Sequence, residues 1–193
     1  DVLSSSRDDD KIAWYERNGS PFKPTTKTEL QTAVDLWVSD KATALSTYGV
    51  INSWNVSLIT DMKELFRDKT TFNDYIGNWD VSNVTTMYAM FKNAHNFNQN
   101  ISSWDVSSAI IMSYFFEHAQ SFNQDLSSWD VSNVTSMNGM FYDSGFNQDI
   151  SNWDVSNVTN MQSMFLQNDN FNGDISSWDV GNVTNMRAMF ENA

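Results

Sequence analysis

Six tryptophans recur along this chain at a nearly constant interval. They are Trp54, Trp79, Trp104, Trp129, Trp153 and Trp178, and the intervals between them are 25, 25, 25, 24 and 25 residues. Internal periods of about 20 to 50 residues are typical of arrays in which each unit buries its apolar face against its neighbours. The interval therefore predicts an elongated stack of repeated units.

The repeated unit extends well beyond tryptophan. It reads approximately Phe-Asn-x-Asp-Ile-Ser-x-Trp-Asp-Val-Ser-Asn-Val-Thr-x-Met-x-x-Met-Phe, as in residues 171–190. Trp153 and Val155 alternate with Asp154, which is the two-residue period of a half-buried strand. We therefore expect one short strand in each unit.

A short helix is expected after each strand. Thr159 can cap it, and Met161, Met164 and Phe165 then follow at the spacing that places three side chains on one helical face. Stacked units would bring Trp, Val, Met and Phe into continuous internal columns. The fold class predicted is an α/β solenoid of the leucine-rich-repeat kind, with one strand and one helix per 25-residue coil.

The first fifty residues do not follow the repeat. Thr26 and Glu29 match a capping box, and the residues after them place apolar side chains on one face of a helix. We expect an N-terminal extension in residues 1–24, a helical cap in residues 25–50 that covers the first coil, and a solenoid in residues 51–193. The solenoid has about six repeats, the last incomplete.

Composition excludes several classes of protein. Cysteine is absent, so disulfides, thiolate metal sites and a cysteine nucleophile are excluded. The formal net charge is −13, and residues 51–193 carry −11 of it, from sixteen acidic and five basic residues. This charge repels phosphate groups, so we expect no nucleic-acid partner. No apolar run of about 18 residues occurs, so we expect no membrane insertion.

The repeat resembles that of the BspA-like leucine-rich-repeat surface proteins, whose units read Trp-Asp-Val-Ser-x-Val-Thr-x-Met-x-x-Met-Phe. Residues 129–137 are nearly a consensus unit, and the resemblance covers residues 28–193. It implies a solenoid on secreted or surface-anchored proteins with roles in adhesion and protein interaction. It implies no catalytic residues.

The third unit departs from the pattern. Residues 108–111 read Ser-Ala-Ile-Ile where other units have Asn-Val-Thr-x, and an aromatic pair follows them. We expect a specialised contact there, made by Ser108, Ile110, Ile111, Tyr114 and Phe115.

One acidic position recurs in five units, at Asp80, Asp105, Asp130, Asp154 and Asp179. Stacked carboxylates could bind calcium, the one cofactor that the sequence suggests. Alternatively, each Asp accepts hydrogen bonds from the Ser-Asn turn that follows it, and the glycine pattern of known calcium repeats is missing. His95 and His118 are expected to be exposed loop residues, since neither has partners in a metal-site or catalytic pattern.

We therefore expect a non-enzymatic interaction module, secreted or displayed at the cell surface, that binds a protein or a glycan. The alternative is a structural or linker subunit of a larger assembly, organellar or membrane-associated, with Met186, Met189 and Phe190 at an open-end interface. The alternative location is an organelle lumen after removal of a targeting segment. Adsorption to ice or mineral is less favoured, because the Thr residues that could form an adsorbing face are expected to cap helices.

Overall fold

A computed structural model describes residues 20–193. The predicted extension, residues 1–24, therefore lies mostly outside the described residues. Helix α2 spans Lys27–Ser39, helix α3 spans Lys41–Tyr48, and a single 3-10 turn, η1, spans Ile51–Ser53. No helix in residues 20–193 combines the length and the apolar character needed to cross a lipid bilayer.

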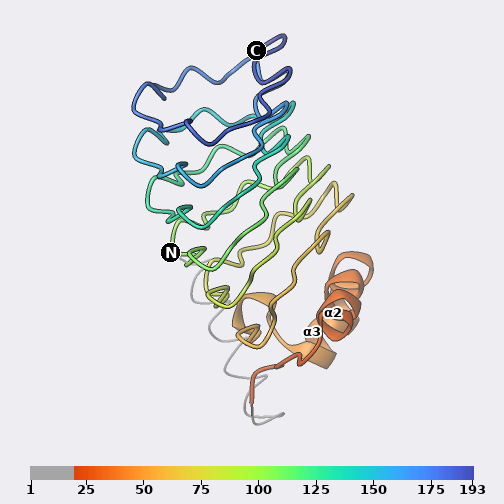
Figure 1. Cartoon of the computed structure of the whole chain (residues 1–193). Helices are drawn as coiled ribbons and strands as arrows, with labels where there is room; N and C mark the ends of the chain where they lie inside the picture. The colour runs from red at the N-terminus through yellow and green to blue at the C-terminus, as the bar shows by residue number, and fades with distance from the viewer. Residues whose placement is uncertain (1–19) are drawn as a thin grey trace.

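Helix α2 begins at the predicted capping box. The Thr26 side chain accepts a hydrogen bond from the Glu29 backbone N–H, and the Glu29 carboxylate accepts one from the Thr26 backbone N–H. The buried face of α2 packs on the first coil, where Trp37 meets the Trp54 ring edge-on at 5.8 Å. Gln31 also donates a hydrogen bond to the Leu65 carbonyl. The two helices lie together at one end of the structure (Figure 1).

Residues 51–193 form a stack of coils (Figure 1). Backbone hydrogen bonds join residues about one repeat apart, such as Thr85 N–H to the Thr60 carbonyl and Met87 N–H to the Ile111 carbonyl. Isolated parallel bridges follow the same line through the stack. They link Asp61, Thr86, Ile111, Ser136, Asn160 and Asn185 in succession.

The predicted fold class is wrong, because the described coils contain no strand. The Trp-Asp-Val segment is too short to form a ladder of β-sheet hydrogen bonds, because the backbone turns on both sides of it. Trp79 N–H bonds to the Ile76 carbonyl, and Val84 N–H bonds to the Val81 carbonyl. β-Bridges between the described coils are limited to single residues that come after this segment, although other backbone hydrogen bonds also join the coils. The structure is therefore not an α/β solenoid with a strand in each repeat.

The predicted helix in each coil is also absent. Residues Met161 to Phe165 form successive turns, and Ser163 and Gln167 adopt positive φ angles of 55°. The N–H groups of Met161 and Phe165 donate to carbonyls of the next coil and not to residues four positions back. Met161, Met164 and Phe165 are still buried, because this ladder of turns also directs i, i+3 and i+4 side chains inward.

The Thr residues expected to cap those helices have another role. Thr85, Thr135, Thr159 and Thr184 each donate a side-chain hydrogen bond to a carbonyl of the preceding coil. They are exposed at the surface. The reason for disfavouring adsorption therefore does not hold, and adsorption stays an untested prediction.

The internal columns are present as expected. The Trp, Met and Phe side chains of neighbouring coils are buried, and Phe rings stack from coil to coil, as in the Phe66–Phe91 pair at 5.2 Å. Five indoles also donate a hydrogen bond to a carbonyl of the previous coil, as Trp79 does to the Ile51 carbonyl at 2.8 Å; the others are Trp104, Trp129, Trp153 and Trp178. Buried aromatic area of this kind contributes most of the stability of a stack.

One coil is a residue shorter than the others, and two residues accommodate the loss. Gly145 sits so close to the preceding coil that a Cβ would lie 2.2 Å from the Gln120 carbonyl oxygen. Asn168, fully buried in the next coil, donates hydrogen bonds to Ser144 Oγ at 3.3 Å and to the Phe146 carbonyl at 3.1 Å. The amide thus satisfies polar groups that the shortened coil leaves inside the stack.

Candidate functional site

The third coil exposes two adjacent isoleucines. Ile110 is 44% exposed and Ile111 is 38% exposed. Ile110 stands in a column that is otherwise threonine, between Thr85 and Thr135, to which it is joined by backbone hydrogen bonds. Ile111 lies on the line of parallel bridges, between Thr86 and Ser136. An aliphatic pair therefore interrupts a polar surface.

The equivalent segments of the neighbouring coils carry no charged residue. Five aligned segments, one in each of the second to sixth coils, form what we call the charge-free strip. They are residues 82–86, 107–111, 132–136, 156–160 and 181–185. The valine or alanine in the middle of each segment is partly or fully buried, so the exposed part of the strip consists of Gly, Ser, Thr, Asn and the two isoleucines. The equivalent segment of the first coil, residues 57–61, is outside the strip because it ends in Asp61. The cores of protein interfaces are likewise depleted of charge.

The strip is held in place from coil to coil. Asn83, Asn133, Asn157 and Asn182 each donate a side-chain hydrogen bond to a serine carbonyl of the preceding coil, at 2.8 to 2.9 Å. Two residues after each of these Asn residues, a Thr hydroxyl also donates a hydrogen bond to a carbonyl of the preceding coil. These bonds fix the rotamers of exposed side chains, so the strip presents an ordered surface.

The third coil is braced on its other side by Tyr114. The Tyr114 hydroxyl accepts a hydrogen bond from Asn138 Nδ2 at 2.7 Å, and its ring meets the Tyr88 ring edge-on at 5.6 Å. Lys92 Nζ lies 5.4 Å from the centre of the ring. The ring fits because the next coil has Gly139 there, where a Cβ would lie 2.6 Å from Tyr114 Cδ1. We call this set of contacts the Tyr114 brace.

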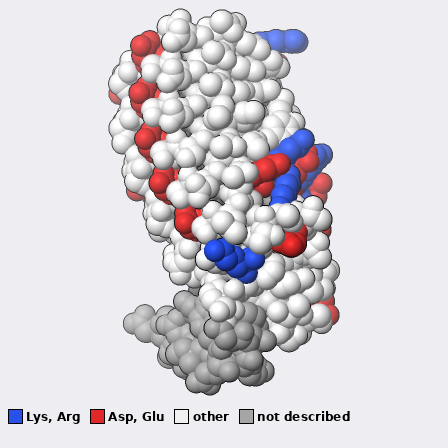
Figure 2. All heavy atoms as spheres, turned by 60° about the horizontal axis from the view of Figure 1, so that its bottom comes forward, with Lys and Arg blue, Asp and Glu red and all other residues white. Residues whose placement is uncertain are grey.

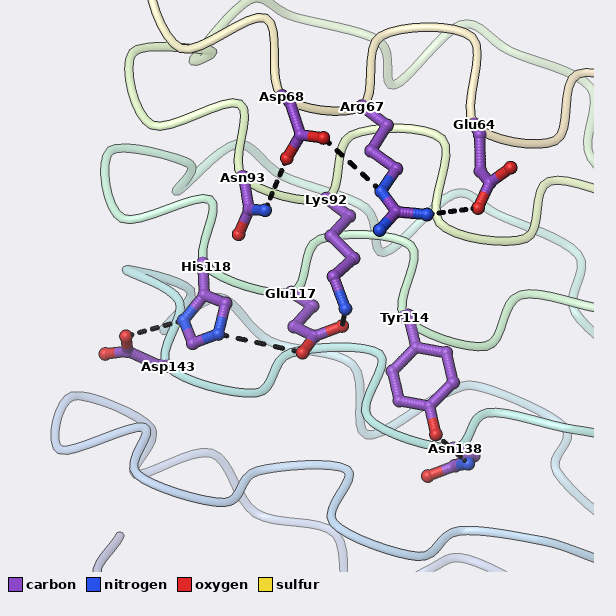
Figure 3. Close-up of polar contacts among 10 residues, drawn as sticks. All are labelled: Glu64, Arg67, Asp68, Lys92, Asn93, Tyr114, Glu117, His118, Asn138 and Asp143. Atoms are coloured by element: carbon purple, nitrogen blue, oxygen red, sulfur yellow. Dashed lines mark hydrogen bonds and ion pairs between the residues drawn. The ribbon is translucent and has the colours of Figure 1, made fainter.

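An ionic chain runs beside the brace (Figure 3). Lys92 Nζ lies 2.6 Å from Glu117 Oε2, His118 Nδ1 lies 2.7 Å from Asp143 Oδ2, and His118 Nε2 lies 3.6 Å from Glu117 Oε1. Glu117 is buried, and its Oε2 makes no well-directed hydrogen bond, so Lys92 is its charge partner. The Lys92–Glu117 ion pair thus joins the second and third coils, and the His118–Asp143 hydrogen bond joins the third and fourth. His118 is partly buried and hydrogen-bonded to Asp143, unlike the exposed loop residue that we expected.

The structure separates the five residues expected to make a special contact. Ile110 and Ile111 are exposed, and Ser108 and Tyr114 are half-buried. Phe115 is fully buried and packs edge-on against Phe91 and Phe116, so it belongs to the core and not to the surface. Met186 and Phe190 of the expected open-end interface are 41% and 49% exposed, whereas Met189 is 7% exposed.

The recurring Asp residues take part in local turns. The Oδ1 atoms of Asp80, Asp105, Asp130 and Asp154 accept hydrogen bonds from the N–H of the serine two residues later, at 3.0 to 3.1 Å, and Asp179 binds Gly181 N–H in the same way. Figure 2 shows acidic side chains following one another along the stack. In residues 20–193, no three His, Asp or Glu side chains are arranged to hold a metal ion. The expected turns are confirmed, and calcium binding stays a prediction.

These turns also affect ionisation. Hydrogen bonds from the hydroxyl and backbone N–H of Ser107 lower the pKa of Asp105, and those from Ser156 lower the pKa of Asp154. Asp125, Asp149 and Asp174 form a second acidic column that we did not single out from the sequence. Hydrogen bonds from the backbone N–H and hydroxyl of the serine two residues later lower their pKa values. The negative charge of the carboxylate in the following coil opposes this shift for Asp125 and Asp149.

Comparison with known proteins identifies a family. The family described as "Mycoplasma protein of unknown function, DUF285" matches residues 37–145 and also residues 131–193, so the matches together span residues 37–193. The chain belongs to this family. The family is linked to BspA-like repeat proteins. No curated protein and no solved structure matches the chain.

Proposed function

We propose that this protein is a non-catalytic interaction module that binds a partner protein through the charge-free strip, with Ile110 and Ile111 as the apolar anchor. The exposed isoleucine pair carries the proposal. Burying the remaining exposed part of each side chain would contribute about 1 kcal/mol. The uncharged residues around the pair can be desolvated without stranding an ion.

The contacts within the third coil support this role. The Tyr114 brace and the Lys92–Glu117 ion pair connect this coil to both neighbours, and hydrogen bonds order the strip itself. A surface that is ordered before binding loses less conformational entropy when a partner docks. The recurring carboxylates occupy equivalent environments, so no pair has the contrast that acid–base catalysis uses.

A matched pair of variants tests the proposal. Ile110→Thr combined with Ile111→Ser restores residues that other coils carry at these positions, so the stack should fold unchanged. Leu58→Asn is the control, because Leu58 is also an exposed aliphatic residue, at 50%, two coils away. Crosslinked partners captured from native cells should be lost with the double variant and kept with Leu58→Asn. If both variants capture the same partners as the unaltered protein, the strip is not the binding surface.

Location at the cell surface is part of the same proposal. The repeat resembles that of BspA-like surface proteins, and the matching family is linked to that group. Protease added to intact cells should cleave a displayed protein. Protection until the cells are lysed would contradict a surface location.

A further inference from the structure

The charge-free strip is periodic as well as uncharged, and this restricts what can cover it. We propose that its occupant is a second copy of this chain, packed strip against strip about a two-fold axis perpendicular to the stack. The inference rests on the proposed function, because it uses the same surface and names its partner.

Periodicity is the first argument. The bridge residues of successive coils pair as parallel strands do, which sets a separation of about 4.8 Å between equivalent side chains. A two-fold partner presents the same rows at the same separation, so a contact that fits at one coil recurs at the others. An unrelated globular surface has no such spacing. Closed two-fold dimers, in which one patch meets itself, are also the commonest soluble oligomers.

The shape of the strip is uniform enough for this packing. Its outer column is β-branched in all five coils of the strip, at Thr85, Ile110, Thr135, Thr159 and Thr184. β-Branched side chains have restricted rotamers, and the Thr hydroxyl bonds to the preceding coil restrict them further. Ile110 therefore keeps the outline of the column while adding the apolar surface that a dimer would bury.

Charge is the second argument. Two chains of net charge −13 repel each other over most of their surfaces. Contact through the strip brings uncharged residues together, and the carboxylates two residues before each segment lie at the edge of the contact. Added salt screens the remaining repulsion, so the dimer should strengthen as ionic strength rises. A partner held by attraction to the acidic columns would weaken instead.

Sedimentation equilibrium of the 193-residue chain tests the inference. The dissociation constant of the dimer is measured in 50 mM and in 500 mM NaCl. We expect a concentration-dependent dimer that is tighter at the higher salt. Thr135→Glu adds a charge in the middle of the strip and should raise the dissociation constant by about tenfold or more. Gln120→Glu adds the same charge at an exposed position outside the strip and should change the constant by less than about threefold.

The outcomes separate this inference from the proposed function. A monomer at every concentration and salt, or a dimer indifferent to Thr135→Glu, overturns self-association. In that case the proposed function would still stand if the Ile110→Thr, Ile111→Ser variant failed to capture a different protein that the unaltered chain captures. If neither association nor capture responds to changes in the strip, both are overturned. Equal urea midpoints for the two Glu variants would show that folding is not the cause of a difference.

Discussion

Gly139 should be intolerant of even one added carbon because of the ring above it. In Gly139→Ala the new Cβ would lie 2.6 Å from Tyr114 Cδ1 and 2.8 Å from Tyr114 Cε1, so the ring has to move. The backbone does not forbid the change. Ala89 and Ala188 occupy the equivalent position in other coils, at φ angles of 51° and 56°, against 59° for Gly139.

The size of the effect follows from the contacts. An alanine in the left-handed region costs about 1 kcal/mol relative to glycine. Displacing the ring removes the Asn138 hydrogen bond, worth about 1 kcal/mol, and the edge contact with Tyr88, worth about 0.5 to 1.5 kcal/mol. We therefore expect Gly139→Ala to lower the free energy of unfolding by about 2.5 to 3.5 kcal/mol. In a Tyr114→Ala background only the backbone part remains, about 1 kcal/mol.

Urea unfolding followed by tryptophan fluorescence measures this double-mutant cycle. The four proteins are compared at the same transition, because stacked repeats can unfold in more than one step. The expected coupling between the two positions is about 1.5 to 2.5 kcal/mol. A coupling below about 0.5 kcal/mol, with Gly139→Ala equally harmful in both backgrounds, would refute the account of the brace.

Two further predictions concern stability. Asn168→Ala removes a buried amide and should lower the free energy of unfolding by about 1 to 3 kcal/mol, whereas Gln167→Ala, at an exposed neighbour, should change it by less than about 0.5 kcal/mol; equal losses would contradict the role of Asn168. The lowered pKa values of Asp105 and Asp154 stabilise the fold above the unfolded-state value of about 3.9, and this stability is lost as pH falls through the folded-state values. The urea concentration at the unfolding midpoint should therefore decrease once the pH drops below about 4, and the decrease should be less steep in Ser107→Ala. A midpoint that stays constant down to about pH 3 would contradict this explanation.

The sequence predicted which side chains are inside, because position within the repeat determines burial. The Trp, Met and Phe columns follow from that alone. A column of asparagines was also predictable from its place in the repeat, at Asn73, Asn98, Asn123, Asn147 and Asn172. Asn98 N–H binds Asn73 Oδ1 at 2.9 Å, and the pattern recurs in later coils. The prediction that this ladder is internal was wrong, because Asn73, Asn123, Asn147 and Asn172 are exposed.

The backbone path could not be predicted from the same pattern. An i, i+3, i+4 apolar spacing is typical of a helix, but here Met161, Met164 and Phe165 reach the core from consecutive turns. These turns require residues such as Ser163 at positive φ, a conformation that the residue type does not indicate. Hydrogen bonds to the next coil stabilise these turns in place of the helical bonds.

The candidate site was predicted in part. The Ile-Ile departure indicated the exposed pair, but a description of the third unit alone could not separate buried Phe115 from half-buried Tyr114. The signal for the brace lies in the adjacent unit. Gly139 stands where other coils have Ala, Ser, Glu or Tyr, and a glycine directly after a bulky residue in the same column indicates that the ring needs its space.

The joints between coils have a consequence for evolution. In each joint, N–H groups of the turn ladder donate toward the following coil, and N–H groups on the Thr column donate toward the preceding one. Every interior coil thus offers its two neighbours the same set of donors and acceptors. Duplication or loss of one whole 25-residue unit would leave the backbone hydrogen bonds of the remaining joints unchanged, except where side chains are matched across a joint, as Tyr114 and Gly139 are. The length of the molecule can therefore change by about 4.8 Å with each coil gained or lost.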